Sequence, residues 1–210
     1  MSESITVLPE AEPKIGRREA AAQDKLNRII EAATIAFAEK GFHGTTIPDV
    51  ATSANVGAGT IYRYFTNKED LVNAVFINSK TKLMLCLAEG FDDGTDLDLK
   101  ARFKLAWNNL CHFARENPED FCFLEMQEHS KYLSRESKAL ERKVLAPLRL
   151  FAQKGQRSGD ISAMPAMSLI AIVWGVFVGL FKADALGYMK VTDKILADAG
   201  DACWKVISRE

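Results

Sequence analysis

The sequence lacks features that mark several classes of protein. Its 27 basic and 28 acidic side chains leave a formal net charge of −1 over 210 residues. A histone-like protein that binds polyanions through bulk positive charge is therefore excluded, and any nucleic-acid site must be a local patch. The 6 prolines and 13 glycines are too few for a collagen-like chain or a proline-rich linker. Hydrophobic residues make up 48% of the chain, which is too much for a disordered protein and enough for a core.

Patterns for metal ligands and disulfides are also missing. The four cysteines form no C-x-x-C pair and have no histidine at zinc-finger spacing: Cys86, Cys111, Cys122 and Cys203. We interpret them as reduced thiols of a cytosolic protein. Glu125 and His129 are four residues apart and share a predicted helix face, so they could form a metal pair. We nevertheless expect no metal and no cofactor.

Long hydrophobic runs are absent as well. The longest apolar run, residues 169–181, has 13 residues and falls short of the roughly 20 that cross a bilayer. Residues 1–16 are acidic and lack the basic segment and apolar stretch of a secretory signal. We therefore expect a soluble, cytoplasmic protein with no membrane partner.

Helical periodicity dominates what remains, and no strand-like alternation of useful length occurs. Apolar residues recur at helical spacing over residues 24–40, and Gly41 follows where a helix often ends. Further helices are predicted over 97–116, 118–133, 136–157, 166–188 and 192–208. Pro147 lies inside one of them and should kink or end it. The fold class is all-α, with about nine helices.

Two short helices with a tight turn between them lie within residues 46–64. Thr46 is a suitable N-cap for a helix from Ile47 to about Ser53, and Asn55 can adopt a positive φ in the turn over residues 54–56. A second helix should run from about Gly57 to Tyr64, and Asn67 should cap the next one, which continues to about Glu89. This arrangement is a helix-turn-helix, whose second helix enters the DNA major groove. Its inner side chains should be Val56 and Ile61, and its outer ones Ala58, Thr60, Tyr62 and Arg63.

The same region resembles the TetR family of bacterial transcriptional regulators. The resemblance covers roughly residues 24–75 and is specific because several spaced elements agree. These elements are Ala33-Thr34-Ile35-Ala36-Phe37-Ala38-Glu39-Lys40-Gly41-Phe42, Gly44-Thr45-Thr46-Ile47, Val50-Ala51, Ala54-Asn55-Val56, Gly59-Thr60-Ile61-Tyr62-Arg63-Tyr64-Phe65 and Asn67-Lys68-Glu69-Asp70-Leu71.

The resemblance implies a DNA-binding site. Its expected residues are Thr46, Ala58, Thr60, Tyr62, Arg63, Tyr64 and Lys68, with Arg17 and Arg18 reaching the minor groove from a flexible arm. Residues 14–70 contain eight basic and seven acidic side chains, so the basic ones must gather on one face. Gly57-Ala58 stands where many relatives have a serine cap and a lysine, which implies one charged contact fewer. The expected domains are an arm (1–20), a helix-turn-helix domain (21–68) and a helical ligand-binding and dimerisation domain (69–210).

Small residues recur every four positions in the penultimate helix, at Ala171, Gly175, Gly179 and Ala183. Such a stripe lets another helix come close. It predicts either a homodimer interface, as the resemblance implies, or a core helix within one subunit. Aromatic and polar residues of the middle helices could line an effector pocket rather than an ordinary core: Trp107, Phe113, Phe123, Met126, His129, Tyr132, Trp174 and Phe177.

These patterns together predict a ligand-responsive transcriptional regulator. We expect a homodimeric repressor that binds a pseudo-palindromic double-stranded DNA operator and is released by a small, largely apolar effector. The alternative is a helical adaptor or ligand-binding protein whose helix-turn-helix is only structural. An enzyme is not expected, because no nucleophile–base pair or phosphate loop is present. The sequence identifies neither the effector nor the operator.

Overall fold

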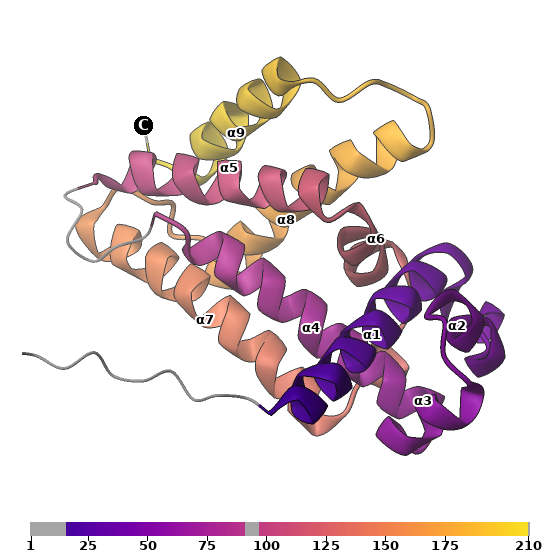
Figure 1. Cartoon of the computed structure of the whole chain (residues 1–210). Helices are drawn as coiled ribbons and strands as arrows, with labels where there is room; N and C mark the ends of the chain where they lie inside the picture. The colour runs from indigo at the N-terminus through magenta and orange to yellow at the C-terminus, as the bar shows by residue number, and fades with distance from the viewer. Residues whose placement is uncertain (1–15, 91–96, 210) are drawn as a thin grey trace, which may run out of the picture.

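The computed structural model describes residues 16–90 and 97–209, and this part of the chain is almost entirely helical (Figure 1). It contains nine α-helices, one short 3-10 helix and a single isolated bridge between Ile161 and Ser208. The helices are α1 (Arg17–Gly44), α2 (Ile47–Ser53), α3 (Ala58–Tyr64), α4 (Lys68–Ala88), α5 (Leu99–Glu116), α6 (Pro118–Met126), η1 (Ser130–Tyr132), α7 (Arg135–Ser158), α8 (Ala166–Ala185) and α9 (Asp193–Ile207). The all-α prediction is confirmed.

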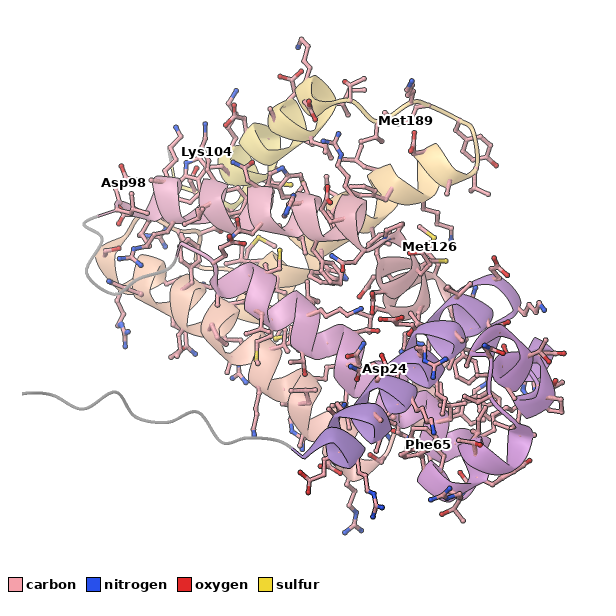
Figure 2. All side chains as sticks on the ribbon, in the orientation of Figure 1. Asp24, Phe65, Asp98, Lys104, Met126 and Met189 are labelled. Carbon is pink, nitrogen blue, oxygen red and sulfur yellow. The ribbon has the colours of Figure 1, made fainter. Side chains whose placement is uncertain are left out.

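Helices α1 to α3 gather at one end of the molecule, and α9 lies far from them (Figure 1). A small apolar core holds the three helices together; Ile29, Val50 and Ile61 are fully buried in it. Figure 2 shows Phe65 among the side chains of this group. Helix α4 begins there and then runs into the larger group, where it packs against α5 and α7. One continuous helix therefore belongs to both parts of the fold.

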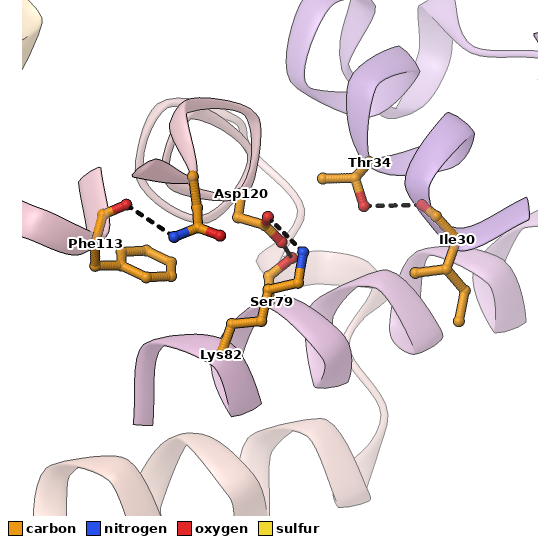
Figure 3. Close-up of polar contacts among 7 residues, drawn as sticks. Ile30, Thr34, Ser79, Lys82, Phe113 and Asp120 are labelled. Carbon is orange, nitrogen blue, oxygen red and sulfur yellow. Dashed lines mark hydrogen bonds and ion pairs between the residues drawn. The ribbon is translucent and has the colours of Figure 1, made fainter. Parts of the chain in front are cut away.

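Helix α6 lies between α1 and α4 and is fastened to both. The buried carboxylate of Asp120 accepts hydrogen bonds from Ser79 Oγ (2.6 Å) and Lys82 Nζ (2.8 Å) on α4 (Figure 3). Gln127, just after α6, donates from Nε2 to the Ala38 carbonyl of α1 at 2.6 Å. Buried polar groups with satisfied hydrogen bonds fix one arrangement of their elements. The position of α6 relative to α1 and α4 is therefore well defined.

Several helix boundaries differ from the sequence predictions. Helix α1 begins at Arg17, so residues 17–20 form its first turn instead of belonging to an arm; the remaining arm, residues 1–15, lies outside the described residues. The alanines at 20–22 favour this extension. Gly41, with φ 66° and ψ −177°, interrupts α1 where a break was predicted.

The helices at 118–133 and 136–157 also depart from prediction. The first ends at Met126, because Gln127 is extended and its side chain is engaged with α1. The second continues through Pro147 to Ser158, so Pro147 does not end it. Proline has no N–H, so Pro147 leaves the carbonyl of Lys143 without its helical partner. Both residues are exposed, where water can satisfy such a carbonyl.

Helix α8 exposes an unusual amount of apolar surface. Among the described residues, α4 and α8 are the two helices long and apolar enough to cross a membrane by length and composition. The most apolar window of α8 has mean hydropathy 2.0 and is only 11% buried, against 39% for α4. The 13-residue run seen in the sequence is thus part of a 20-residue helix. Its outer face is therefore an exposed apolar surface of the kind that often marks an interaction site.

Close packing of α9 on α5 depends on a glycine. Trp107 donates its indole N–H to the Leu196 carbonyl at 2.8 Å, and a Cβ added to Gly200 would lie 2.7 Å from Trp107 Cδ1. We predict that Gly200→Ala lowers the free energy of unfolding by about 1–3 kcal/mol through overpacking. Urea titration followed by circular dichroism measures this. Gly59→Ala, where nothing lies within 4 Å, is the control and should cause no loss; equal stability of the two variants would contradict the prediction.

Candidate nucleic-acid interface and cavities

The two short helices form a well-determined unit. The Thr46 hydroxyl accepts the Asp49 N–H (3.3 Å) and caps α2, as predicted. Asn55 has φ 53°, which confirms the predicted left-handed residue in the turn, and the Val56 N–H bonds the Ala51 carbonyl at 3.0 Å. From α1, Arg28 donates to the Ala54 carbonyl at 3.3 Å. Helix α1 thus supports the turn that sets the direction of α3.

Helix α3 has one buried face and one open face. Ile61 is fully buried, whereas Tyr62 is 57% exposed and Arg63 is exposed beside it. Ala58 and Thr60 are half-buried, so they face outward less than predicted, because α3 rests on the domain core at its N-terminal end. Tyr64 is 37% exposed and donates its hydroxyl to the Ala22 carbonyl of α1 at 3.2 Å. The outermost side chains of α3 are therefore Tyr62 and Arg63.

Lys68 has a structural role that the sequence did not suggest. Its ammonium group donates to the carbonyls of Phe42 (2.8 Å) and Thr45 (3.0 Å) and lies 4.2 Å from the centre of the Phe42 ring. These contacts join the start of α4 to the end of α1. An ammonium has three N–H donors, so one remains for a phosphate. Arg18 is exposed in the first turn of α1, where its charge opposes the helix dipole.

A large apolar cavity of about 380 Å³ lies between α4, α5, α7 and α8. Only Trp107 and Trp174 of the predicted pocket residues line it. The sequence did not single out most of its wall, which includes Met84, Val144, Leu148 and Ile170. On α7, apolar residues recur at helical spacing at Val144, Leu148 and Phe151, and this stripe could have indicated the cavity wall in the sequence.

The other six predicted pocket residues lie elsewhere. Phe113, Phe123 and Phe177 are core side chains with at most 1% exposure, and Met126 ends α6 (Figure 2). His129 is buried and stacks on Phe123 with ring centres 4.6 Å apart. Tyr132 stacks on Phe42 of α1 at 3.7 Å and its hydroxyl lies 2.8 Å from His43 Nε2. The spacing of aromatic residues alone does not show which helix face lines a cavity. Residues of the core and of the contact with α1 were therefore predicted as pocket residues.

A second, smaller cavity of about 240 Å³ has charged walls. Lys80 lies 3.8 Å from Glu125 Oε1 and 3.7 Å from Glu141 Oε1, and Trp174 donates its indole N–H to Glu125 Oε2 at 2.7 Å. Burial raises the pKa of Glu125, and the nearby Lys80 opposes that shift. Glu125 and His129 do not share a helix, since α6 ends between them. Across residues 16–90 and 97–209, no group of three potential ligands could hold a metal.

The small-residue stripe of α8 faces outward. Ala171, Gly175 and Gly179 are exposed and Ala183 is half-buried. A Cβ added to Gly175 or Gly179 would meet nothing within 4 Å. The stripe is therefore not packed inside this chain, which disfavours a core helix within one subunit.

The turn between α2 and α3 is supported by α1, and α3 has one exposed face. These features define the chain as a helix-turn-helix DNA-binding protein. It belongs to the tetR family of bacterial regulatory proteins, whose model matches residues 29–75, and residues 76–209 match the tetracyclin repressor-like C-terminal domain. It is therefore a TetR-family transcription regulator, and this family is non-enzymatic.

Individual relatives agree with this assignment. The uncharacterised regulator YhgD of Bacillus subtilis is 49% identical over 53 residues, which are 25% of this chain and 28% of that protein. The regulator TtgR of Pseudomonas putida is 29% identical over 179 residues, 77% of this chain and 82% of that protein. A TetR-family structure from Vibrio parahaemolyticus is 28% identical with a TM-score of 0.73, covering 89% of this chain and 100% of that chain.

The environment of His129 predicts a loss of stability in acid. Burial, together with the charge of Lys80, lowers the pKa of His129 below its ordinary value near 6.5. The unfolded chain then binds a proton more readily, so the folded state loses stability as pH falls from 7 through this lowered pKa. We predict that the melting temperature falls less between pH 7.5 and 5.5 in His129→Phe than in the unmodified protein. His112→Phe, at an exposed site, is the control; parallel pH curves for His129→Phe and the unmodified protein would exclude this role.

Proposed function

We propose that this regulator is a homodimeric repressor that binds a pseudo-palindromic operator and leaves it when a small, largely apolar effector binds. The observation that carries the proposal is the open face of α3, where Tyr62 and Arg63 project from a helix whose other face is locked into a core. Side chains placed in this way reach base edges when the helix enters the major groove. The protein would act in the cytoplasm, where its DNA lies.

The roles of individual side chains are proposed from their positions. Arg63 has the forked donors that suit guanine or phosphate, and Tyr62 is the other outward contact. Thr46, Thr60, Tyr64 and Lys68 are proposed to hold phosphates, with Ala58 close to the groove. Arg17 is the first residue of α1. Arg18 is exposed in the first turn, and DNA phosphates would relieve the repulsion between its charge and the helix dipole.

The dimer is proposed from the exposed face of α8. Apolar patches of this size on a soluble protein commonly mark an interaction surface. A two-fold axis would place the glycine stripe of one α8 against its copy and let the two helices approach closely. Helix α9 packs beside α8, so the pair can form a four-helix interface with its symmetry mates.

The effector is proposed to occupy the large cavity, whose wall is almost wholly apolar. Helices α4 and α8 both line it, so a ligand there contacts the helix that starts at the DNA-binding domain and the helix of the proposed dimer interface. A ligand shifts such a protein only by binding its two states with different affinity.

Operator binding tests the proposal directly. DNA from upstream of the protein's own gene, compared with a scrambled duplex by fluorescence anisotropy at two salt concentrations, should show a preference of roughly 10³ or more. Arg63→Ala should weaken specific binding about tenfold or more, because a base contact contributes ~1–3 kcal/mol. Arg142→Ala, exposed on α7, is the control. If a pool of random duplexes also yielded no preferred site, the adaptor alternative would replace this proposal.

Replacing the stripe glycines tests the dimer. A Cβ at Gly175 or Gly179 meets nothing within 4 Å in a single chain, whereas leucine at either position would separate two copies of α8 packed through the stripe. We expect both variants to run as monomers in size-exclusion chromatography with light scattering, with unchanged helical content. Ala146→Leu, exposed on α7, should remain a dimer. A dimer in both glycine variants would show that the stripe is not the contact.

A further inference from the structure

The smaller cavity adjoins the large one. The two share four lining residues, Val144, Leu148, Ile170 and Trp174. The large cavity is apolar, whereas the small one brings together Lys80 from α4, Glu125 from α6 and Glu141 from α7. Its position suits the polar end of a ligand whose apolar body lies in the large cavity. A role for the small cavity in ligand binding rests on the proposed effector role of the large one.

Lys80 is a buried ammonium group that lines this space. The residue is 7% exposed, and its two carboxylate neighbours, at 3.7 and 3.8 Å, are farther away than a hydrogen bond allows. Lys80 therefore forms two ion pairs that are longer than ordinary hydrogen bonds, and its ammonium group also lies 5.9 Å from the centre of the Trp174 ring. These distances leave room for a ligand atom that accepts a hydrogen bond from Lys80.

The carboxylate opposite Lys80 needs a donor. Glu125 Oε2 accepts the Trp174 indole N–H at 2.7 Å, which orients the group. Its other oxygen, Oε1, faces Lys80 across the 3.8 Å gap. An oxygen placed about 2.8 Å from both Lys80 Nζ and Glu125 Oε1 would bridge this gap at ordinary hydrogen-bond length. The bridging group must accept from Lys80 and donate to Glu125.

Three kinds of polar group can be compared. A carboxylate accepts from Lys80 but is repelled by Glu125 and Glu141, and it has no proton to donate. An ammonium group donates to the carboxylates and balances their excess charge, but it cannot accept a hydrogen bond from Lys80. A hydroxyl does both without adding charge to a buried site. We propose that the effector is an uncharged aromatic alcohol or phenol, whose hydroxyl bridges Lys80 and Glu125 and whose apolar body lies in the large cavity.

We infer that the apolar body of the effector is aromatic from the side chains that line the large cavity. Phe103, Trp107, Phe151 and Trp174 all line the large cavity, and flat rings pack well against such side chains. Trp174 touches both cavities and holds Glu125, so it positions the carboxylate relative to a ring beside it.

A series of naphthalene derivatives tests the proposal. The probes are 2-naphthalenemethanol, 2-naphthylmethylammonium, 2-naphthoate and 2-methylnaphthalene, which share a ring and differ in one small group. Affinities for the purified full-length protein are measured by isothermal titration calorimetry at pH 7.5 without DNA. We expect the alcohol to bind about tenfold or more tightly than the methyl compound, and both charged compounds to bind more weakly than the alcohol.

Two variants test whether the hydroxyl of the ligand binds Lys80 and Glu125. Lys80→Met and Glu125→Gln should each reduce the advantage of the alcohol over the methyl compound to about threefold or less, and leave the affinity of the methyl compound nearly unchanged. Glu125→Gln keeps the size of the side chain and an acceptor for Trp174, so it remains informative if Lys80→Met does not fold. Lys143→Met, exposed on α7, is the control and should keep the full advantage.

Each other outcome overturns the proposal. Tightest binding of the naphthoate or of the ammonium compound would mean that the polar end of the effector is charged. Equal binding of the alcohol and the methyl compound would mean that the small cavity contributes no hydrogen bond, and no binding by any probe would exclude an aromatic alcohol of this kind. Operator binding is measured separately by anisotropy, so failure here is distinguishable from failure of the repressor proposal.

Discussion

The fold depends on how α6 is held between α1 and α4. Asp120 is buried and would destabilise the protein if its charge had no partner, but Ser79 and Lys82 of α4 satisfy it. On the other side, Gln127 bonds the backbone of α1, and Tyr132 stacks on Phe42 where α1 ends. The DNA-binding domain therefore rests on α6 and on the segment after it. A displacement of α6 cannot occur without moving α1 or breaking these contacts.

This constraint connects the cavities to the DNA-binding domain. Glu125 lies on α6 and faces the small cavity, while Asp120 on the same helix faces α4. Asn73 of α4 donates to the Tyr132 carbonyl at 2.8 Å and accepts from the Ser134 N–H at 2.8 Å, so the loop that comes after α6 is fastened to α4 as well. An effector bound at Glu125, as proposed, would contact a helix that packs firmly against α1 and α4, the two elements that orient α2 and α3. Coupling between an effector site and a DNA-binding site typically corresponds to a free energy of about 1–3 kcal/mol.

The helix-turn-helix was predictable because its signals are local. The Thr46 cap, the left-handed Asn55 and the Asn67 cap each depend on a few neighbouring residues, and each appears in the structure as predicted. The cavity was not predictable in this way, since residues spread from Met84 to Ile207 along the chain form its wall. Lys80 did carry a signal, as a charge at helical spacing between the buried residues Phe76 and Leu83. Solvent access allows α7 to continue through Pro147, and a tertiary hydrogen bond of Gln127 accompanies the end of α6. Hydrophobic periodicity carries no information about either effect.

The small net charge of the DNA-binding domain bears on the proposed pairing of two copies. Residues 14–70 have eight basic and seven acidic side chains, and Lys68 uses two of its three donors on backbone carbonyls. One such domain can neutralise few phosphates, and affinity from counterion release grows with the number of phosphates contacted. Joining two domains makes the second binding event intramolecular and raises the overall affinity without any new contact, provided that the spacing of the half-sites matches. The exposed stripe of α8 and the small net charge of this domain therefore both support the proposed homodimer, in which affinity would come from pairing and the geometry of the pair would control it.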